Sequence, residues 1–105
     1  MTTKQKSALK TLEEITGQKL TLGGLLAAIR KGDGLSQTEF ADLLGMASNR
    51  YLSDVEHGRR LVSPKMAAKY AEKLQYSPRQ FVRLCLQDMV NRDGIKVDVI
   101  LKEAA

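Results

Sequence analysis

Helix start and stop signals follow one another so closely in this sequence that only short helices fit between them. Serine or threonine N-caps precede apolar residues at helical spacing, and each run ends at a glycine or at the next Ser-Pro start. The predicted helices span residues 22–31, 37–44, 48–57, 64–74 and 78–91. Because short connections force neighbouring helices to pack closely, the sequence predicts a compact all-α domain of five helices.

The two ends of the chain depart from this pattern. Residues 1–19 are polar and weakly periodic, which predicts a mobile arm or a loosely docked helix. Residues 95–101 alternate in polarity and are rich in β-branched side chains, so we expect one short C-terminal β-strand. Such a strand needs a partner for its free edge.

Composition excludes several classes of function. The chain has 105 residues with one cysteine and one histidine, which excludes a disulfide framework and most zinc and catalytic-triad arrangements. We therefore expect no enzyme, no metal and no cofactor, and we interpret Asp88 and Asp93 as surface charges. No apolar run is long enough for a membrane span and no signal-peptide core is present, so a cytoplasmic protein is expected. The net charge of +5 weakly favours an anionic partner.

The segment 35–60, LSQTEFADLLGMASNRYLSDVEHGRR, contains two short helices joined by a tight glycine-containing turn, which is typical of a helix-turn-helix. The segment strongly resembles the Xre family of Cro/CI-type helix-turn-helix repressors. The matching positions are Leu35-Ser36-Gln37, Glu39, Phe40-Ala41, Leu44-Gly45, Leu52-Ser53, Val55-Glu56 and Gly58-Arg59, together with Arg30. The resemblance covers about residues 20–76 and implies a lambda-repressor-like fold. In one departure, the stretch from Met46 to His57 is one residue longer than is usual, so the turn is longer or the second helix starts differently.

Helical geometry indicates which face of the helix at 48–57 is exposed. A rotation of 100° per residue turns Leu52 and Val55 toward the core. Polar side chains that suit base edges and phosphates then point away from the core or lie on its flanks. They are Asn49, Arg50, Tyr51, Ser53, Asp54 and His57. Asp54 accepts a hydrogen bond from a cytosine amine, or it orients Arg50 four residues earlier.

The resemblance, together with this geometry, implies specific roles in binding double-stranded DNA. The expected base contacts are Asn49, Arg50, Ser53 and Asp54, and the expected backbone contacts are Ser36, Gln37, Ser48, Tyr51, Arg59 and Arg60. The first turns of both helices also present free backbone N–H groups to anions. Arg30 is expected to pair with Glu56, partly on the basis of the family.

The helix at 78–91 carries apolar residues over an arc of about 240°, more than one small core requires. Either the N-terminal arm and the C-terminal strand cover the additional apolar surface of this helix, or another chain covers it. Because repressors of this type bind two half-sites as dimers, we expect a homodimer. Its predicted interface comprises Val82, Leu86, Met89, Val90, Val97 and Val99.

The expected organisation is therefore a polar arm (1–19), a helix-turn-helix DNA-binding domain (20–76) and a C-terminal dimerisation part (77–105). The expected function is sequence-specific repression. The dimer would occupy a palindromic operator and thereby exclude polymerase from it. The alternative is an antitoxin resembling HigA, which neutralises a small ribonuclease toxin and represses its own operon. A third interpretation, favoured only by the lengthened turn, is an interaction module that no longer binds DNA.

Overall fold

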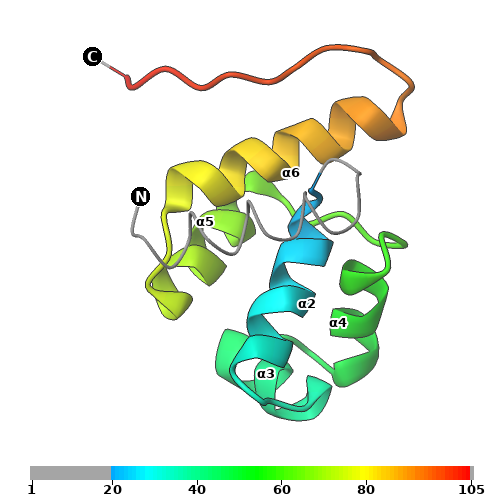
Figure 1. The fold of residues 1–105 in the computed structure, drawn as a ribbon, viewed down its shortest axis with the longest axis vertical. Coiled ribbons are helices and arrows are strands. Elements are labelled where there is room, and N and C mark those ends of the chain that lie inside the picture. The colour runs from blue at the N-terminus through cyan, green and yellow to red at the C-terminus, as the bar shows by residue number, and fades with distance from the viewer. Residues whose placement is uncertain (1–19, 105) are drawn as a thin grey trace.

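The computed structural model describes residues 20–104, which contain five α-helices (Figure 1). These are α2 (Leu22–Gly32), α3 (Gln37–Leu44), α4 (Asn49–Glu56), α5 (Pro64–Leu74) and α6 (Pro78–Arg92). The all-helical domain expected from the sequence is thus observed. The arm predicted for residues 1–19 lies outside the described residues.

Every one of these helices begins at a serine or threonine whose side chain accepts a hydrogen bond from a backbone amide of the first turn. The N-caps are Thr21, Ser36, Ser48, Ser63 and Ser77. At α3 the cap is reciprocal, because Glu39 accepts from the backbone amide of Ser36 and so forms a capping box. These hydrogen bonds lower the pKa of Glu39 below its usual value. The chain therefore fixes where each helix begins by local chemistry.

In the core α2 packs against α4 and α6, α3 packs against α4 and α5, and α5 and α6 pack extensively on each other. The largest fully buried side chains are Leu22, Leu25, Leu26, Phe40, Leu44, Leu52, Phe81 and Leu84. At Gly23 the backbone of α2 lies so close to the end of α4 that a Cβ would overlap the carbonyl oxygen of Val55. This close approach sets the position of α4 against the rest of the domain.

The β-strand predicted for residues 95–101 is not present. Residues 95–104 instead run as an extended segment back along α6 (Figure 1, orange to red) and belong to no β-ladder within the described chain. A strand is defined by backbone hydrogen bonds to a second strand. Here the amide of Ile95 bonds to the carbonyl oxygen of Val90 in α6 (3.0 Å), and further along the segment the backbone bonds to side chains of α6. No second strand pairs with the segment within residues 20–104, which explains why an extended, β-branched sequence is not a strand.

Two side chains of α6 hold this C-terminal segment. The side-chain amide of Gln87 donates to the carbonyl oxygen of Val97 (2.8 Å) and accepts from the amide of Val99 (2.7 Å). Arg79 donates to the carbonyl oxygen of Leu101 (2.6 Å). Gln87 is buried as a result, although the sequence gives it no apolar character.

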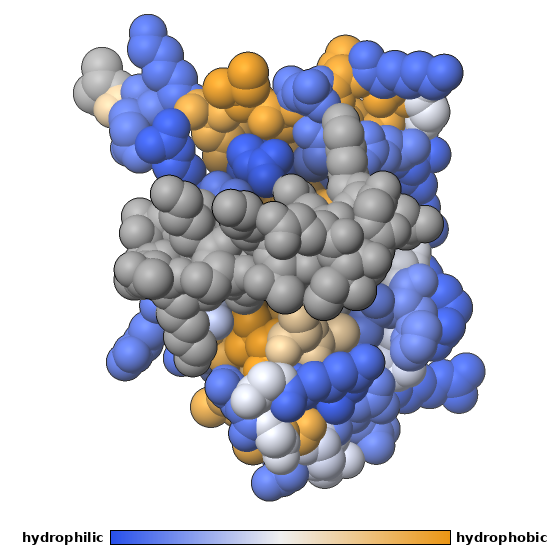
Figure 2. Space-filling model, in the orientation of Figure 1, coloured by the Kyte–Doolittle hydropathy of each residue, from blue (hydrophilic) through white to orange (hydrophobic). Residues whose placement is uncertain are grey.

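The C-terminal segment also places apolar side chains in solvent. Ile95, Val97 and Ile100 are 47%, 50% and 86% exposed. Figure 2 shows apolar surface among hydrophilic residues at the top of the molecule, where the segment runs. In the described residues no helix is long and apolar enough to cross a membrane.

Candidate nucleic-acid interface

The α4 helix has one buried and one exposed side, and the exposed side is polar. Leu52 and Val55 are almost inaccessible to solvent, at 0% and 3% exposure. The opposite side carries Asn49, Arg50 and His57, which are exposed, and Ser53 and Asp54, which are partly exposed. An α-helix with such a face fits the width of the major groove of B-DNA.

The turn between α3 and α4 is fixed at both ends. Gly45 adopts the left-handed conformation (φ 72°) that ends α3, and the amide of Met46 bonds to the carbonyl oxygen of Ala41 (2.9 Å). The Met46 side chain is buried in the core. Ser48 then caps α4. The longer turn is therefore anchored at Met46, and Asn49 is the first residue of α4.

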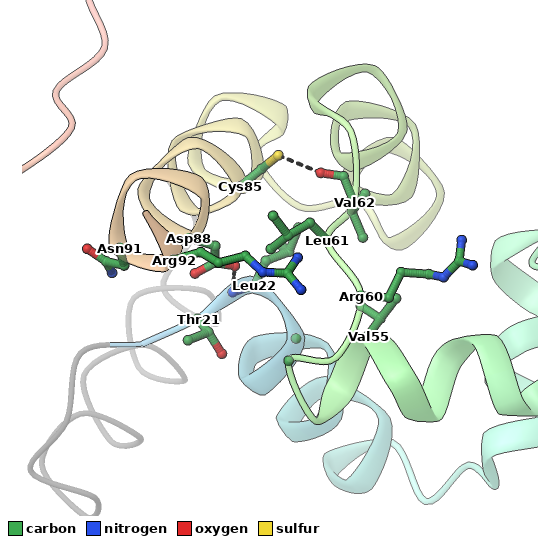
Figure 3. A pocket seen from close by; sticks show the side chains of 12 residues that line it. Thr21, Leu22, Val55, Arg60, Leu61, Val62, Cys85, Asp88, Asn91 and Arg92 are labelled. Carbon is green, nitrogen blue, oxygen red and sulfur yellow. Dashed lines mark hydrogen bonds between the residues drawn. The ribbon is translucent and has the colours of Figure 1, made fainter. Parts of the chain in front are cut away.

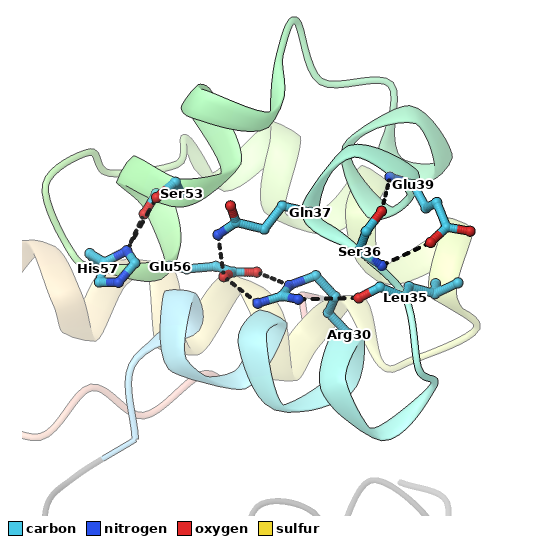
Figure 4. Close-up of polar contacts among 8 residues, drawn as sticks. All are labelled: Arg30, Leu35, Ser36, Gln37, Glu39, Ser53, Glu56 and His57. Atoms are coloured by element: carbon cyan, nitrogen blue, oxygen red, sulfur yellow. Dashed lines mark hydrogen bonds and ion pairs between the residues drawn. The ribbon is translucent and has the colours of Figure 1, made fainter.

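A buried ion pair ties α4 to α2 (Figure 4). Arg30 Nε and Nη2 donate to the two carboxylate oxygens of Glu56 (2.8 and 3.1 Å), and Arg30 Nη1 donates to the carbonyl oxygen of Leu35 (3.1 Å). The side chain of Arg30 is only 13% exposed, and that of Glu56 only 4%. The hydrogen bonds with Glu56 raise the pKa of Arg30 above its usual value. The guanidinium and the carboxylate therefore satisfy each other's hydrogen-bonding groups.

Gln37 extends this network to α3. Its side-chain amide donates to Glu56 Oε1 (3.2 Å), so the first residue of α3 and the last residue of α4 share one carboxylate. Since a side-chain amide has two N–H groups, Gln37 retains a donor for a further partner. Asn49 likewise donates to the hydroxyl of Thr38 (3.1 Å), which links the first turns of α3 and α4.

Asp54 does not orient Arg50, contrary to one of the two roles considered for it. Its carboxylate pairs with Arg59, with Nε and Oδ1 separated by 2.9 Å. The chain turns back after α4, where the amide of Arg59 bonds to the carbonyl oxygen of Asp54 (2.8 Å), and this brings the guanidinium onto the carboxylate. Within residues 20–104 the Arg50 guanidinium forms no hydrogen bond or ion pair.

The remaining polar side chains are oriented by their neighbours. His57 Nδ1 lies 2.7 Å from the carbonyl oxygen of Ser53, which can only accept, so Nδ1 carries the proton. The guanidinium of Arg60 lies 4.9 Å from the ring centroid of Tyr51, a cation–π contact. Burial, and to a smaller extent the neighbouring Tyr51, raises the pKa of Tyr70 to about 12.

The residues predicted for a dimer interface lie on α6 and the C-terminal segment. Val82, Leu86, Met89 and Val90 are partly buried, Val97 is half exposed and Val99 is partly buried. By helical rotation Gln87, which holds the C-terminal segment, lies opposite the centre of the apolar arc of α6. Sequence reasoning did not identify Gln87, and no periodic signal marks it, because it lies between the two ends of that arc.

The interpretation of Asp88 as a surface charge is wrong. Its Oδ2 accepts from the backbone amide of Leu22 at the start of α2 (3.1 Å). Desolvation raises its pKa to about 6. No group of three or more His, Cys, Asp or Glu side chains in residues 20–104 has the arrangement of a metal site. Cys85 is buried, donates to the carbonyl oxygen of Val62 (2.8 Å) and has a raised pKa, consistent with an inert thiol.

Comparison with known proteins places this geometry in a family. The model of the helix-turn-helix family matches residues 26–81, more than half of the chain. The "ImmF control region 10 kDa protein" of Bacillus phage phi105 is 47% identical over 57 residues. The match spans 54% of this chain and 60% of the phage protein. No solved structure matches the chain. The chain belongs to the Cro/CI-type helix-turn-helix family, the Xre family.

Proposed function

We propose that this protein is a transcriptional repressor that binds a specific DNA sequence through the outer face of α4. The observation that carries the proposal is the contrast across that helix. Leu52 and Val55 fix one side in the core, whereas the Arg50 guanidinium extends from the other with no partner in residues 20–104. Arginine in a major groove donates two hydrogen bonds to guanine O6 and N7.

The proposed contacts divide into two groups. Base edges are contacted by Asn49, Arg50, Ser53 and Asp54, and phosphates by Ser36, Gln37, Ser48, Tyr51, Arg59 and Arg60. The capping hydroxyls of Ser36 and Ser48 accept from backbone amides, which leaves each hydroxyl hydrogen available for a phosphate oxygen. Tyr51 contributes mainly by holding Arg60. Phosphate contacts supply affinity and base contacts supply sequence preference.

We further propose that residues 77–105 form a homodimer interface, so that two copies of α4 enter successive major grooves of a palindromic operator. The partly buried apolar residues of α6 and the exposed Ile95, Val97 and Ile100 support this arrangement. The name of the phage relative, a control-region protein, agrees with a regulatory role. A dimer on such an operator excludes polymerase and thereby represses transcription.

Selection of duplexes from a random pool tests the proposal. We expect enrichment of an inverted repeat whose half-sites are about one helical turn apart, and protection of both half-sites in footprinting. Failure to enrich any motif would contradict sequence-specific binding. Enrichment of a single half-site would contradict the dimer alone.

Sedimentation at micromolar concentration tests the dimer separately. We expect the full chain to sediment as a dimer, and Val90→Asp to shift it to monomer because a buried carboxylate destabilises an apolar interface. Lys69→Asp, which changes an exposed residue of α5, is the control and should remain dimeric. A monomeric full chain, or a dimer that survives Val90→Asp, would refute the interface.

The alternative function, an antitoxin that binds a small toxin protein, stays a prediction. The features that favour it are the polar arm at residues 1–19, which lies outside the described residues, and the excess apolar face of α6, which a second copy of the chain also fits. No contact in residues 20–104 favours it over the repressor.

A further inference from the structure

A cavity of about 330 Å³ lies between the start of α2, the end of α4, the following loop and α6 (Figure 3). Its volume is at the lower end of the range for small-molecule sites. Apolar side chains form much of its wall, from Leu22, Val55, Leu61 and Val62. The polar groups at the cavity include Asp88, Asn91, Arg60 and Arg92.

One polar atom of this wall lacks a partner. Asp88 Oδ2 accepts from the amide of Leu22, but Asp88 Oδ1 is buried and forms no hydrogen bond within the structure. A buried carboxylate oxygen without a donor destabilises a fold, because its lost hydration is not replaced. A ligand that brings an N–H donor, above all a cationic one, satisfies this oxygen. The orphaned oxygen therefore indicates the chemistry of one end of a ligand.

The opposite charge is also present. Figure 3 shows the Arg92 side chain extending from α6 toward Leu22 and Leu61, across the same cavity that Asp88 lines. Arg92 and Arg60 form no ion pair within residues 20–104. A guanidinium binds a carboxylate through parallel hydrogen bonds. The cavity thus combines an anionic group, a cationic group and an apolar wall.

We propose that this cavity binds a small zwitterion of the α-amino-acid class with an apolar side chain. The ammonium group donates to Asp88, the carboxylate bonds to Arg92, and the side chain packs on Leu61 and Val62. Val55 belongs to α4, and Gly58 and Arg60 belong to the loop that follows it. Occupancy therefore changes how Arg60 is presented to DNA, a regulatory consequence that rests on the proposed function.

Titration calorimetry and thermal shift with the full chain test the site. The probes are L-leucine, leucinamide, which lacks the carboxylate, and N-acetyl-L-leucine, which lacks the ammonium group; L-phenylalanine tests a larger side chain. We expect L-leucine or L-phenylalanine to bind with a submillimolar Kd, and both derivatives of leucine to bind at least tenfold more weakly than leucine. No binding by either amino acid, or equal binding by N-acetyl-L-leucine and L-leucine, would overturn the proposal.

Variants locate the site. Asp88→Asn and Arg92→Gln should each weaken binding at least tenfold, whereas Asp93→Asn and Arg83→Gln, which change α6-region residues outside this cavity, should not. Asp88→Asn retains an oxygen for the Leu22 amide, so the fold should persist. If the Asp88→Asn variant does not fold, the affinities of the wild-type protein for L-leucine and N-acetyl-L-leucine still test the proposal.

The regulatory consequence has its own readout. With the bound amino acid at saturation, we expect at least a threefold change in the Kd for the selected duplex. Binding by calorimetry without such a change would overturn the regulation. A protein that binds no duplex at all would refute the proposed function, while calorimetry would still test the site.

Discussion

The two sides of α4 each carry an arginine–carboxylate pair, and the two pairs differ in burial far more than in geometry. Arg30 and Glu56 are 2.8 Å apart with side chains 13% and 4% exposed, whereas Arg59 and Asp54 are 2.9 Å apart and 58% and 31% exposed. The buried pair also bonds to Gln37 and to the carbonyl oxygen of Leu35. Within residues 20–104 the side chains of the exposed pair have no such additional links.

The same two chemical groups therefore have separate roles on opposite sides of one helix. Removing one partner of a buried pair leaves an uncompensated charge, which is strongly destabilising. An exposed pair contributes little, because solvent screens both charges. The inner side of α4 therefore fixes the helix, and the outer side is free to exchange its partners for DNA.

The largest expected effect comes from breaking the inner pair. Glu56→Ala should lower the free energy of unfolding by about 3–5 kcal/mol, because Arg30 then stays buried without its counter-charge. Asp54→Ala, the matched change on the outer side, should cost less than about 1 kcal/mol. Urea denaturation measures both. Equal losses would show that the two sides are not energetically distinct.

A second change tests the inner side through its backbone contact. Gly23→Ala places a Cβ against the carbonyl oxygen of Val55 and forces α2 and α4 apart. We expect a loss of about 1–3 kcal/mol, as for other overpacked sites. Gly32→Ala is the control, since a Cβ there meets nothing within 4 Å. Thermal unfolding should leave the control unchanged or slightly stabilised, and an equally tolerated Gly23→Ala would contradict the close packing.

A third carboxylate, Asp88, sharpens the comparison because it is desolvated without a cationic partner. Burial raises its pKa from 3.8 to about 6, so the folded state binds the proton more tightly than the unfolded chain. The stability that this proton contributes is fully present below about pH 4 and is lost as pH rises through about 6. Over this range we expect the free energy of unfolding of the wild type to fall by about 1–2 kcal/mol relative to that of Asp88→Asn, after allowance for solvent screening.

Denaturation of both proteins between pH 4 and pH 7 measures this effect. The ordinary titration of the other carboxylates is common to both and cancels in the difference. Parallel stability curves for the two proteins would show that Asp88 has an unperturbed pKa.

Much of the fold was predictable because its determinants are local. Ser36 and Glu39 form the capping box that their spacing predicts, and Leu52 and Val55 are buried as helical periodicity requires. The end of α3 at Gly45 likewise depends on one left-handed residue. Such features depend on neighbours within four positions, which a single sequence displays.

The errors concern contacts that helical or strand periodicity does not show. Alternation in residues 95–101 indicates an extended backbone but not what that backbone bonds to, and the partner is the side chain of Gln87. Asp88 contacts Leu22, 66 positions away, so no local pattern shows its burial. Helical spacing allows Asp54 to reach Arg50, but the backward turn of the loop brings Arg59 to it instead.

The most direct test of the account concerns Arg50 on the outer side of α4. We predict that Arg50→Ala lowers affinity for the selected duplex by about 1–3 kcal/mol and relaxes preference at one base position per half-site. Arg59→Ala is the matched control. It should weaken binding to selected and scrambled duplexes alike, and reduce the slope of log K against log salt by about one for each phosphate that the variant no longer neutralises.

The deciding measurement is the ratio of Kd values for the scrambled and selected duplexes at several salt concentrations, with thermal unfolding to confirm that both variants are folded. The account predicts that this ratio falls for Arg50→Ala and is unchanged for Arg59→Ala. A ratio that Arg50→Ala leaves intact would contradict the assignment of the outer face of α4 as the surface that recognises bases.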